Sequence, residues 1–244
     1  MDRGTFERRR QSFGRAAALY DRARPAYPQE AIEWMLGREP LRVVDLGAGT
    51  GIFSRELAAR GHPVKAVDPD AKMRRRLELS SPGVEALAGS AEAIPCGDES
   101  VDAVVAAQSF HWFDNDVALA EIARVLVPGG LFAPIWNVRD ESVSWVRQLS
   151  TVIGSGTAVD TTVHAGPGRD FGPRFARPDR AEFAYAVQHT VESMLELVRT
   201  RSVYIEAGDD DRAVMEERLR ALVEGFDEPF VLPYRTVAFR TRRV

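Results

Sequence analysis

The chain has 244 residues, of which 45% are hydrophobic and 9% aromatic, a composition typical of a globular protein long enough to bury a full core. Its charged first residues lack the apolar core of a signal peptide, and no apolar run approaches the roughly 18 residues that cross a bilayer, so we expect a cytoplasmic protein without membrane contact. A single cysteine, Cys96, excludes a disulfide framework, and the net charge of −4 argues against a nucleic-acid partner.

Predicted helices and strands alternate through the first half of the chain, which is typical of a parallel sheet covered on both faces. Residues 1 to 40 are predicted to form a helical entry cap, and residues 41 to 140 the cofactor-binding core. Short apolar runs predict strands over 42–46, 63–67, 84–87, 101–107 and 131–136. Helices are predicted over 5–37, 52–60, 70–79 and 114–126. Pro128-Gly129-Gly130 predicts a tight turn before the fifth strand.

The second half of the chain has a looser pattern. Residues 154 to 180 are rich in Gly, Pro and Thr without a sustained period, and a loop of this length in a compact domain is usually functional, so we interpret it as a mobile lid. Residues 181 to 244 are predicted to complete the sheet, with strands over 183–190 and 234–240 and helices over 192–206 and 210–225. The sequence therefore predicts a single domain over residues 1 to 244.

A glycine-rich loop follows the first predicted strand. Residues 43 to 51 read VVDLGAGTG, so a short apolar strand that carries Asp45 leads into Gly47, Gly49 and Gly51. Glycines at the end of a parallel strand let a ligand lie against bare backbone N–H groups at a helix start, as in nucleotide-cofactor sites. The dinucleotide fingerprint requires a further glycine at position 52, where this chain has Ile52. The spacing disfavours NAD and FAD and suits a cofactor without phosphate.

Asp68 ends the second predicted strand, about 20 residues after the glycine loop. A carboxylate at this position can accept hydrogen bonds from both hydroxyls of a ribose, and it implies that the ribose is not phosphorylated. The alternative interpretation is that Asp68 caps the helix that follows.

The glycine loop and Asp68 occur together with several other motifs, in a fixed order along the chain. On the basis of this ordered set, the chain resembles the class I S-adenosylmethionine-dependent methyltransferases. It is most similar to the type 11, ubiquinone-biosynthesis-like group that acts on small molecules, and its N-terminal stretch resembles the trans-aconitate methyltransferase-like subgroup. The matching segments are residues 13–28, 43–51, 66–70, 89–95, 101–112 and 124–130. The resemblance implies an α/β, Rossmann-like mixed sheet of seven strands in the order 3-2-1-4-5-7-6, with the last strand antiparallel, helices on both faces and an N-terminal helical cap.

The resemblance also implies S-adenosyl-L-methionine as the cofactor and S-adenosyl-L-homocysteine as its product. The residues that it assigns to cofactor binding are Tyr20, Arg24, Asp45, Gly47, Ala48, Gly49, Asp68, Pro69, Ser90, Ala91, Glu92 and Gln108. The glycine loop and Gln108 are expected to contact the methionyl half, residues 90 to 92 the adenine, and Tyr20 and Arg24 the cofactor from above. Three alternatives stay open: a surface position for Glu92, a backbone contact for Gln108 and core packing for Tyr20.

Four consecutive aromatic residues, Phe110 to Phe113, follow the fourth predicted strand at the edge of the sheet where ligands bind in this class of fold. Within them, His111 is the candidate catalytic base, because its ordinary pKa suits proton transfer near neutral pH. Alternatively, these side chains form the pocket wall and His111 orients a backbone group. The other histidines show no ligand spacing with it, so no metal site is predicted.

The acceptor is predicted to be a small molecule, because the chain lacks the Asn/Asp-Pro-Pro-Tyr/Phe motif of enzymes that methylate amino groups of nucleic acids or glutamine. Arg24 beside Tyr27, with Trp136 and Asn137 after the fifth strand, suits an acceptor with a carboxylate and an apolar body. Three classes of function stay open: an O-, C- or N-methyltransferase, a cofactor-binding protein that does not methylate, and a nicotinamide oxidoreductase that Ile52 disfavours. The sequence does not assign an oligomeric state.

Overall fold

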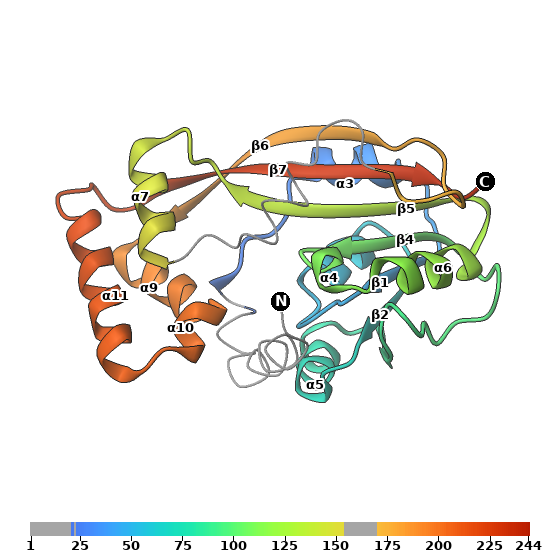
Figure 1. The fold of residues 1–244 in the computed structure, drawn as a ribbon, viewed down its shortest axis with the longest axis horizontal. Helices are drawn as coiled ribbons and strands as arrows, with labels where there is room; N and C mark the ends of the chain where they lie inside the picture. The colour runs from blue at the N-terminus through green and yellow to red at the C-terminus, as the bar shows by residue number, and fades with distance from the viewer. Residues whose placement is uncertain (1–20, 22, 154–169) are drawn as a thin grey trace.

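The protein is built around a seven-stranded mixed sheet, seen in a computed structural model that describes residues 21, 23–153 and 170–244 (Figure 1). The strands are β1 (Val43–Leu46), β2 (Val64–Asp68), β3 (Glu85–Ala88), β4 (Val101–Ala107), β5 (Leu126–Arg139), β6 (Asp179–His189) and β7 (Phe230–Arg242). Their order is β3-β2-β1-β4-β5-β7-β6, and β7 runs antiparallel to both of its neighbours. The predicted fold class and strand order are thus confirmed.

The parallel half of the sheet forms because its strands are short apolar runs that helices cover on both sides. All four residues of β1 are buried, and five of the seven in β4 are buried, as expected for central parallel strands. β1 pairs with β2 and with β4, so Val43 lies beside Val64 on one side and Ala103 on the other. This register brings the carboxyl ends of the three strands to one edge of the sheet.

Helices cover both faces of the sheet. Those described are α3 (Gln29–Leu36), α4 (Ile52–Ala59), α5 (Ala71–Ser80), the short 3₁₀ helix η2 (Phe110–Trp112), α6 (Asn115–Val125), α7 (Ser144–Ile153), α9 (Val191–Arg199), α10 (Ser202–Glu206) and α11 (Asp209–Leu222). Helices α3 and α4 bury Ile32 and Leu57 against one face, and α6 buries Ile122 against the other. These two apolar layers hold the glycine loop at a fixed position relative to the sheet.

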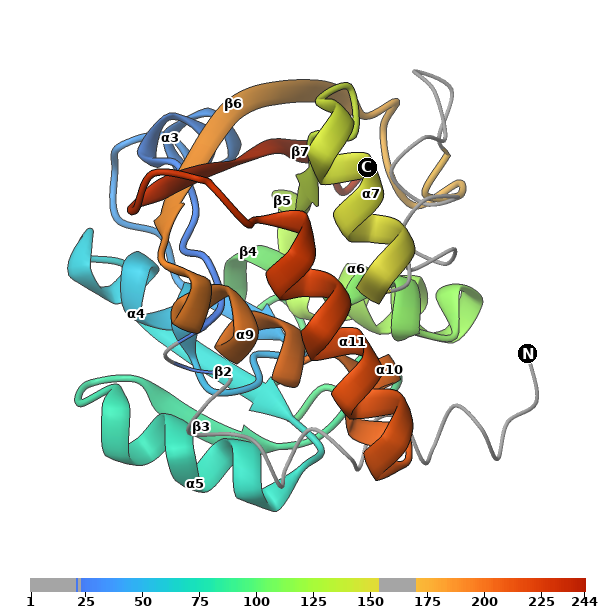
Figure 2. The same cartoon turned by 90° about the vertical axis from the view of Figure 1, so that its left-hand side faces the viewer.

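A second helical layer covers the far ends of the long strands. Helices α7, α9, α10 and α11 gather there, on the left in Figure 1, and they face the viewer in Figure 2. Their apolar core includes Leu149, Leu197 and Leu219, together with Leu232 of β7. We call α7, α9, α10 and α11 the helical unit.

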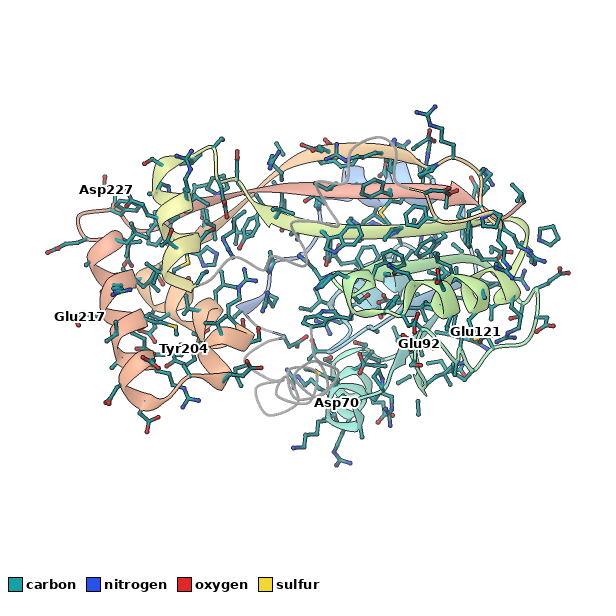
Figure 3. All side chains as sticks on the ribbon, viewed as in Figure 1. Asp70, Glu92, Glu121, Tyr204, Glu217 and Asp227 are labelled. Atoms are coloured by element: carbon teal, nitrogen blue, oxygen red, sulfur yellow. The ribbon has the colours of Figure 1, made fainter. Side chains whose placement is uncertain are left out.

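A network of polar side chains ties three helices of the helical unit together. The Arg199 guanidinium donates to both carboxylate oxygens of Glu216 at 2.9 and 3.0 Å, and the hydroxyl of Tyr204, labelled in Figure 3, donates to the same carboxylate at 2.6 Å. The Arg199 and Tyr204 hydrogen bonds lower the pKa of Glu216 to about 2. A charged Glu216 therefore links α9, α10 and α11, and fixes the end of α9 near the pocket described below.

Several predicted boundaries were wrong. The entry segment is not helical from 24 to 28, where Pro25 and Pro28 interrupt it, and the helix predicted over 192–206 is split into α9 and α10. Strand β5 starts at Leu126, so the predicted turn at residues 128 to 130 lies within the strand. The register of its pairing with β4 shifts there. Helix α7 was not predicted at all.

The predicted lid over 154–180 falls mostly on residues 154–169, which lie outside the described part of the chain. Its described end packs into the core: Phe171 is 1% exposed and stacks edge-on against Phe110, Phe132 and Phe239. Residues 170–178 are thus anchored in the domain core by the side chains of Phe171 and Phe175, and they do not form a lid.

Candidate functional site

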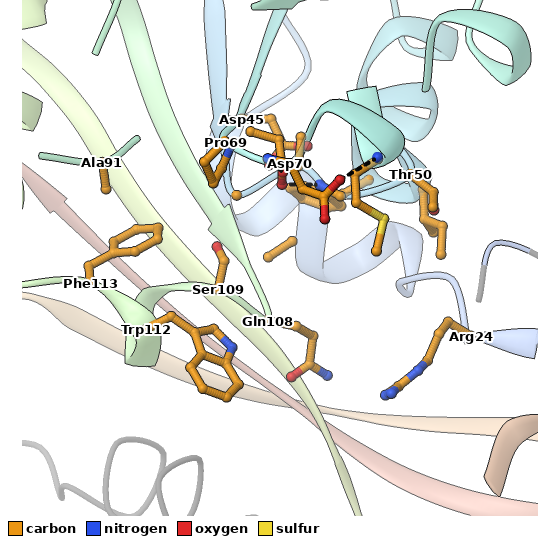
Figure 4. A pocket seen from close by; sticks show the side chains of 18 of the residues that line it. Arg24, Asp45, Thr50, Pro69, Asp70, Ala91, Gln108, Ser109, Trp112 and Phe113 are labelled. Carbon is orange, nitrogen blue, oxygen red and sulfur yellow. Dashed lines mark hydrogen bonds between the residues drawn. The ribbon is translucent and has the colours of Figure 1, made fainter. Parts of the chain in front are cut away.

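A pocket opens at the carboxyl edge of β1, β2 and β4, at the point where the strand order reverses between β1 and β4 (Figure 4). Eleven of the twelve predicted cofactor-binding residues line it: Arg24, Asp45, Gly47, Ala48, Gly49, Asp68, Pro69, Ser90, Ala91, Glu92 and Gln108. The twelfth, Tyr20, lies outside the described residues. One structural site therefore collects segments that are widely separated in the sequence.

The glycine loop reaches the pocket in a backbone conformation that side chains disfavour. Gly47 has a φ of 66°, and a Cβ built there would lie 2.7 Å from the Cβ of Ser109. Gly49 has a φ of 58°, and no described atom lies within 4 Å of a Cβ built on it. Gly47 is thus required by close packing, whereas Gly49 lines the pocket and leaves open space beside its Cα.

Asp68 holds the glycine loop through its carboxylate. Its Oδ2 accepts a hydrogen bond from the Gly49 N–H at 2.9 Å, and its Oδ1 accepts one from the Asp70 N–H at 2.8 Å. A carboxylate oxygen has two lone pairs and can accept more than one hydrogen bond. The N-cap of α5 is Asp70, whose carboxylate accepts from the backbone N–H groups of Lys72 and Met73. The capping role considered for Asp68 therefore belongs to Asp70.

Asp45 places a buried carboxyl group behind the loop. The Ser54 hydroxyl donates to its Oδ2 at 2.6 Å, whereas Oδ1 has no hydrogen-bond partner among the described residues. Burial raises the pKa of Asp45 to about 7, and the nearby charge of Asp68 acts in the same direction. Because a buried acceptor without a partner is costly, Oδ1 fits a ligand that brings a donor or a positive charge to this end of the pocket.

The raised pKa of Asp45 predicts that the contribution of this group to the stability of the ligand-free protein falls between about pH 5 and about pH 8. The folded protein binds this proton more tightly than the unfolded chain, where the ordinary pKa is 3.8. The stabilising contribution is therefore complete below that value and is lost as the pH rises through about 7, which amounts to roughly 2 to 3 kcal/mol over this window. The lowered pKa values of His62, His111 and His189 act in the opposite direction, so the difference in urea unfolding between wild type and Asp45→Asn isolates the contribution of Asp45. Because the introduced asparagine cannot ionise, the variant should gain stability relative to wild type as the pH rises across the window. A constant difference would contradict the assignment.

Two further predicted residues support the pocket through backbone contacts. Glu92 is half-buried, and its Oε1 accepts a hydrogen bond from the Asp114 N–H at 3.0 Å, which ties the segment after β3 to the start of α6. Gln108 has a φ of 55°, and its Nε2 donates to the carbonyl of Asn137 at 2.8 Å. The backbone contact considered for Gln108 is thus present, and it fixes the orientation of an amide that lines the pocket.

His111 is placed differently from the expectation. It is not among the described residues that line the pocket, whereas its neighbours Trp112 and Phe113 are (Figure 4). Its Nδ1 accepts a hydrogen bond from the Trp136 indole at 3.2 Å, and burial lowers the pKa of His111 to about 4. The ring is therefore neutral at pH 7 and carries its proton on Nε2, so it has no free basic nitrogen in this arrangement. This geometry argues against His111 as the general base.

The other wall of the pocket carries Arg24, Arg201 and Tyr234. Arg24 donates to the hydroxyl and the carbonyl of Thr200, both at 3.1 Å, and so joins the entry segment to the break between α9 and α10. Arg201 lies in this break, as the N-cap of α10. Tyr234 comes from β7 and is 4% exposed. Arg201 and Tyr234 were not predicted, because no local motif in the sequence marks either residue.

The described ranges, 21, 23–153 and 170–244, hold no cluster of three His, Cys, Asp or Glu side chains suited to a metal ion. In the same ranges, none of the helices has both the length and the apolar character needed to cross a membrane.

Comparison with known proteins identifies the family. The methyltransferase domain family matches residues 44–133. An uncharacterised methyltransferase of Mycobacterium tuberculosis is 40% identical over 237 residues, which cover 94% of each chain. A malonyl-[acyl-carrier protein] O-methyltransferase of Methylococcus capsulatus is 40% identical over 134 residues, 50% of this chain and 48% of its own.

A solved structure from Anaeromyxobacter dehalogenans, described as a type II methyltransferase, is 27% identical, with a TM-score of 0.61 over 90% of this chain and 96% of its own. The full-length relative, the matched domain and the shared fold agree with the loop and pocket geometry. The chain belongs to the class I S-adenosylmethionine-dependent methyltransferases.

Proposed function

We propose that this protein transfers a methyl group from S-adenosylmethionine to a small-molecule acceptor. The observation that carries the proposal is the composition of one pocket wall. There, Gly49 and the Asp68 carboxylate lie with Oδ1 of Asp45, which has no hydrogen-bond partner among the described residues. The sulfonium cofactor has two ribose hydroxyls and an amino-acid end that carries an ammonium group beside a carboxylate. Carboxylate oxygens such as those of Asp45 and Asp68 accept hydrogen bonds from hydroxyl and ammonium groups of this kind.

The residues present fit the cofactor. Asp68 would accept from the ribose hydroxyls, and the segment at Ala91 and Glu92 would lie against the adenine. Asp45 and the loop at Gly47 would hold the amino-acid end. When bound, the cofactor supplies a methyl group on a positively charged sulfur that is already activated for displacement. The chain therefore has to position two molecules and keep water away.

The aromatic wall contributes to that positioning. Trp112 and Phe113 line the pocket next to Ala91, and Figure 4 shows them on the side away from Arg24. The ring of Phe113 packs edge-on against Phe110, which is 1% exposed, so the wall is anchored in the core. A fixed apolar wall excludes water and limits the orientations of an acceptor near the methyl group. The acceptor atom in this proposal is oxygen, nitrogen or carbon.

Two measurements test the proposal. Titration calorimetry should show binding of S-adenosylhomocysteine and no response to NAD. Incubation with methyl-labelled S-adenosylmethionine and a metabolite extract should then transfer the label to a small molecule that mass spectrometry identifies. Binding without label transfer would favour the alternative of a cofactor-binding protein that does not methylate. Failure to bind either sulfur compound would refute the proposal.

A further inference from the structure

The geometry points to an oxyanion-binding subsite for the acceptor, formed by Arg201 and Tyr234 on the wall opposite the glycine loop, with Arg24 at its edge. This inference rests on the proposed function, since it concerns the second substrate of the same pocket. It assigns to the acceptor a carboxylate or phosphate group, whose oxygens would face these three side chains.

Tyr234 provides the first argument. Its side chain lines the pocket and is 4% exposed, yet its hydroxyl has no hydrogen-bond partner in the described part of the chain. Burial raises the pKa of Tyr234, so the hydroxyl keeps its proton at neutral pH and can donate it. A buried donor that faces a ligand cavity and has no partner is typical of a position that a ligand acceptor fills.

Three arginines provide the second argument. The guanidinium groups of Arg201, Arg139 and Arg24 all lie near enough to Tyr234 to oppose the rise of its pKa, with Arg201 the strongest. Arg139 is 8% exposed and donates to the Ser150 hydroxyl at 2.9 Å, which places a positive charge behind the pocket wall. A guanidinium group can only donate hydrogen bonds. Phenol and guanidinium groups together form a wall of donors that suits an oxyanion.

The distribution of charge across the pocket provides the third argument. The wall at the glycine loop carries the acidic side chains of Asp45, Asp68, Asp70 and Glu92, whereas the opposite wall carries Arg24 and Arg201. The sulfonium cofactor is a cation at its reacting end and suits the acidic wall. An anionic acceptor suits the basic wall, and attraction to it would bring the acceptor toward the bound methyl group. The two walls thus separate the two substrates by charge.

The helical unit keeps this subsite in place. Arg201 stands at the break between α9 and α10, and Arg24 holds the break through its two bonds to Thr200. Tyr234 lies on β7, paired with Arg139 of β5 and Tyr185 of β6. The subsite is therefore built on a paired strand and a fixed helix junction.

The test uses the full chain saturated with S-adenosylhomocysteine, so that the cofactor's own carboxylate is already placed. Succinate and inorganic phosphate are titrated by calorimetry at constant ionic strength, with succinamide as the neutral control. We expect wild type to bind at least one of the two anions and not succinamide; succinate alone would identify a carboxylate subsite, and phosphate alone a phosphate subsite. Tyr234→Phe, which preserves the volume of the ring, and Arg201→Gln should each weaken anion binding by at least fivefold. Arg38→Gln, at a surface arginine whose side chain is 83% exposed, should not change it.

Three outcomes would overturn the inference: no anion binding by the saturated wild type, equal binding of succinamide, or a loss of S-adenosylhomocysteine affinity in both variants that matches the loss of anion binding. The last would assign the wall to the cofactor's carboxylate. A metabolite extract divided by anion exchange separates this inference from the proposed function. Label should pass only to the retained, anionic pool. Transfer only to the unretained pool would refute the subsite and leave methyl transfer intact.

Discussion

Replacing Asp68 by alanine is expected to weaken the binding of S-adenosylhomocysteine by a factor of roughly 100 to 10,000. The proposed ribose contact consists of two hydrogen bonds to a charged carboxylate, each worth roughly 1.5 to 3 kcal/mol. The same carboxylate also orders the glycine loop, since its Oδ2 accepts from the Gly49 N–H at 2.9 Å. The substitution therefore removes a ligand contact and loosens the backbone that the ligand lies against. Titration calorimetry measures the loss, and circular dichroism checks that the variant is folded.

The adjacent carboxylate provides the matched control for this prediction. Asp70 also lines the pocket, but its Oδ1 already accepts from the N–H groups of Lys72 and Met73 as the N-cap of α5. Asp70→Ala should therefore cost about 1 kcal/mol of stability through the lost cap, and it should change the affinity less than about fivefold. Equal losses of affinity in the two variants would show that general acidity of this wall, and not the position of Asp68, determines binding.

Local sequence patterns predicted the parallel half of the fold well. Strands β1 and β4 are short apolar runs buried on both faces, a pattern expected for the central strands of a covered parallel sheet. The glycine loop and the carboxylate at the end of β2 are similarly local, because the conformation of a turn depends on residues within a few positions of it. The order of the antiparallel strands came from the family resemblance and not from the pattern.

Tertiary contacts explain the errors in the second half. No Gly or Pro marks the break between α9 and α10, which lies where Arg24 donates to the carbonyl and hydroxyl of Thr200, 176 residues away in the chain. Helix α7, which was not predicted, does carry a local signal: Val146, Leu149 and Ile153 recur at helical spacing and are all buried.

The same distinction applies to the site. The cofactor wall consists of motifs, so a sequence can indicate it residue by residue. The opposite wall adds Arg201 and Tyr234 to the predicted Arg24. Tyr234 reaches it from β7, which inserts between β5 and β6, and Arg201 from the junction of α9 and α10. His111 shows the reverse case: the residue type and position suggested a base, and only the Trp136 indole on its Nδ1 reveals a different role. Convergence of distant segments and side-chain orientation are properties that sequence patterns do not carry.

The three glycines at 47, 49 and 83 are expected to respond differently to alanine, although each has a positive φ, of 66°, 58° and 92° respectively. Alanine in a left-handed conformation costs about 1 to 2 kcal/mol at any of them. At Gly47 the new Cβ would also lie 2.7 Å from the Cβ of Ser109, and such overpacking adds about 1 to 3 kcal/mol. Gly47→Ala should therefore be the least stable variant, with a total loss of about 2 to 5 kcal/mol in urea unfolding.

Gly49→Ala separates the effect on the ligand from the effect on the fold. No described atom lies within 4 Å of the new Cβ, and Gly49 lines the pocket, so the added methyl group would take up space against the ligand instead of the core. We expect only the left-handed cost in stability, together with a loss of S-adenosylhomocysteine affinity of roughly tenfold. Gly83→Ala is the matched control, since Gly83 is exposed and equally free of neighbours but does not line the pocket. If Gly49→Ala and Gly83→Ala bound S-adenosylhomocysteine equally well, the cofactor would not lie against Gly49.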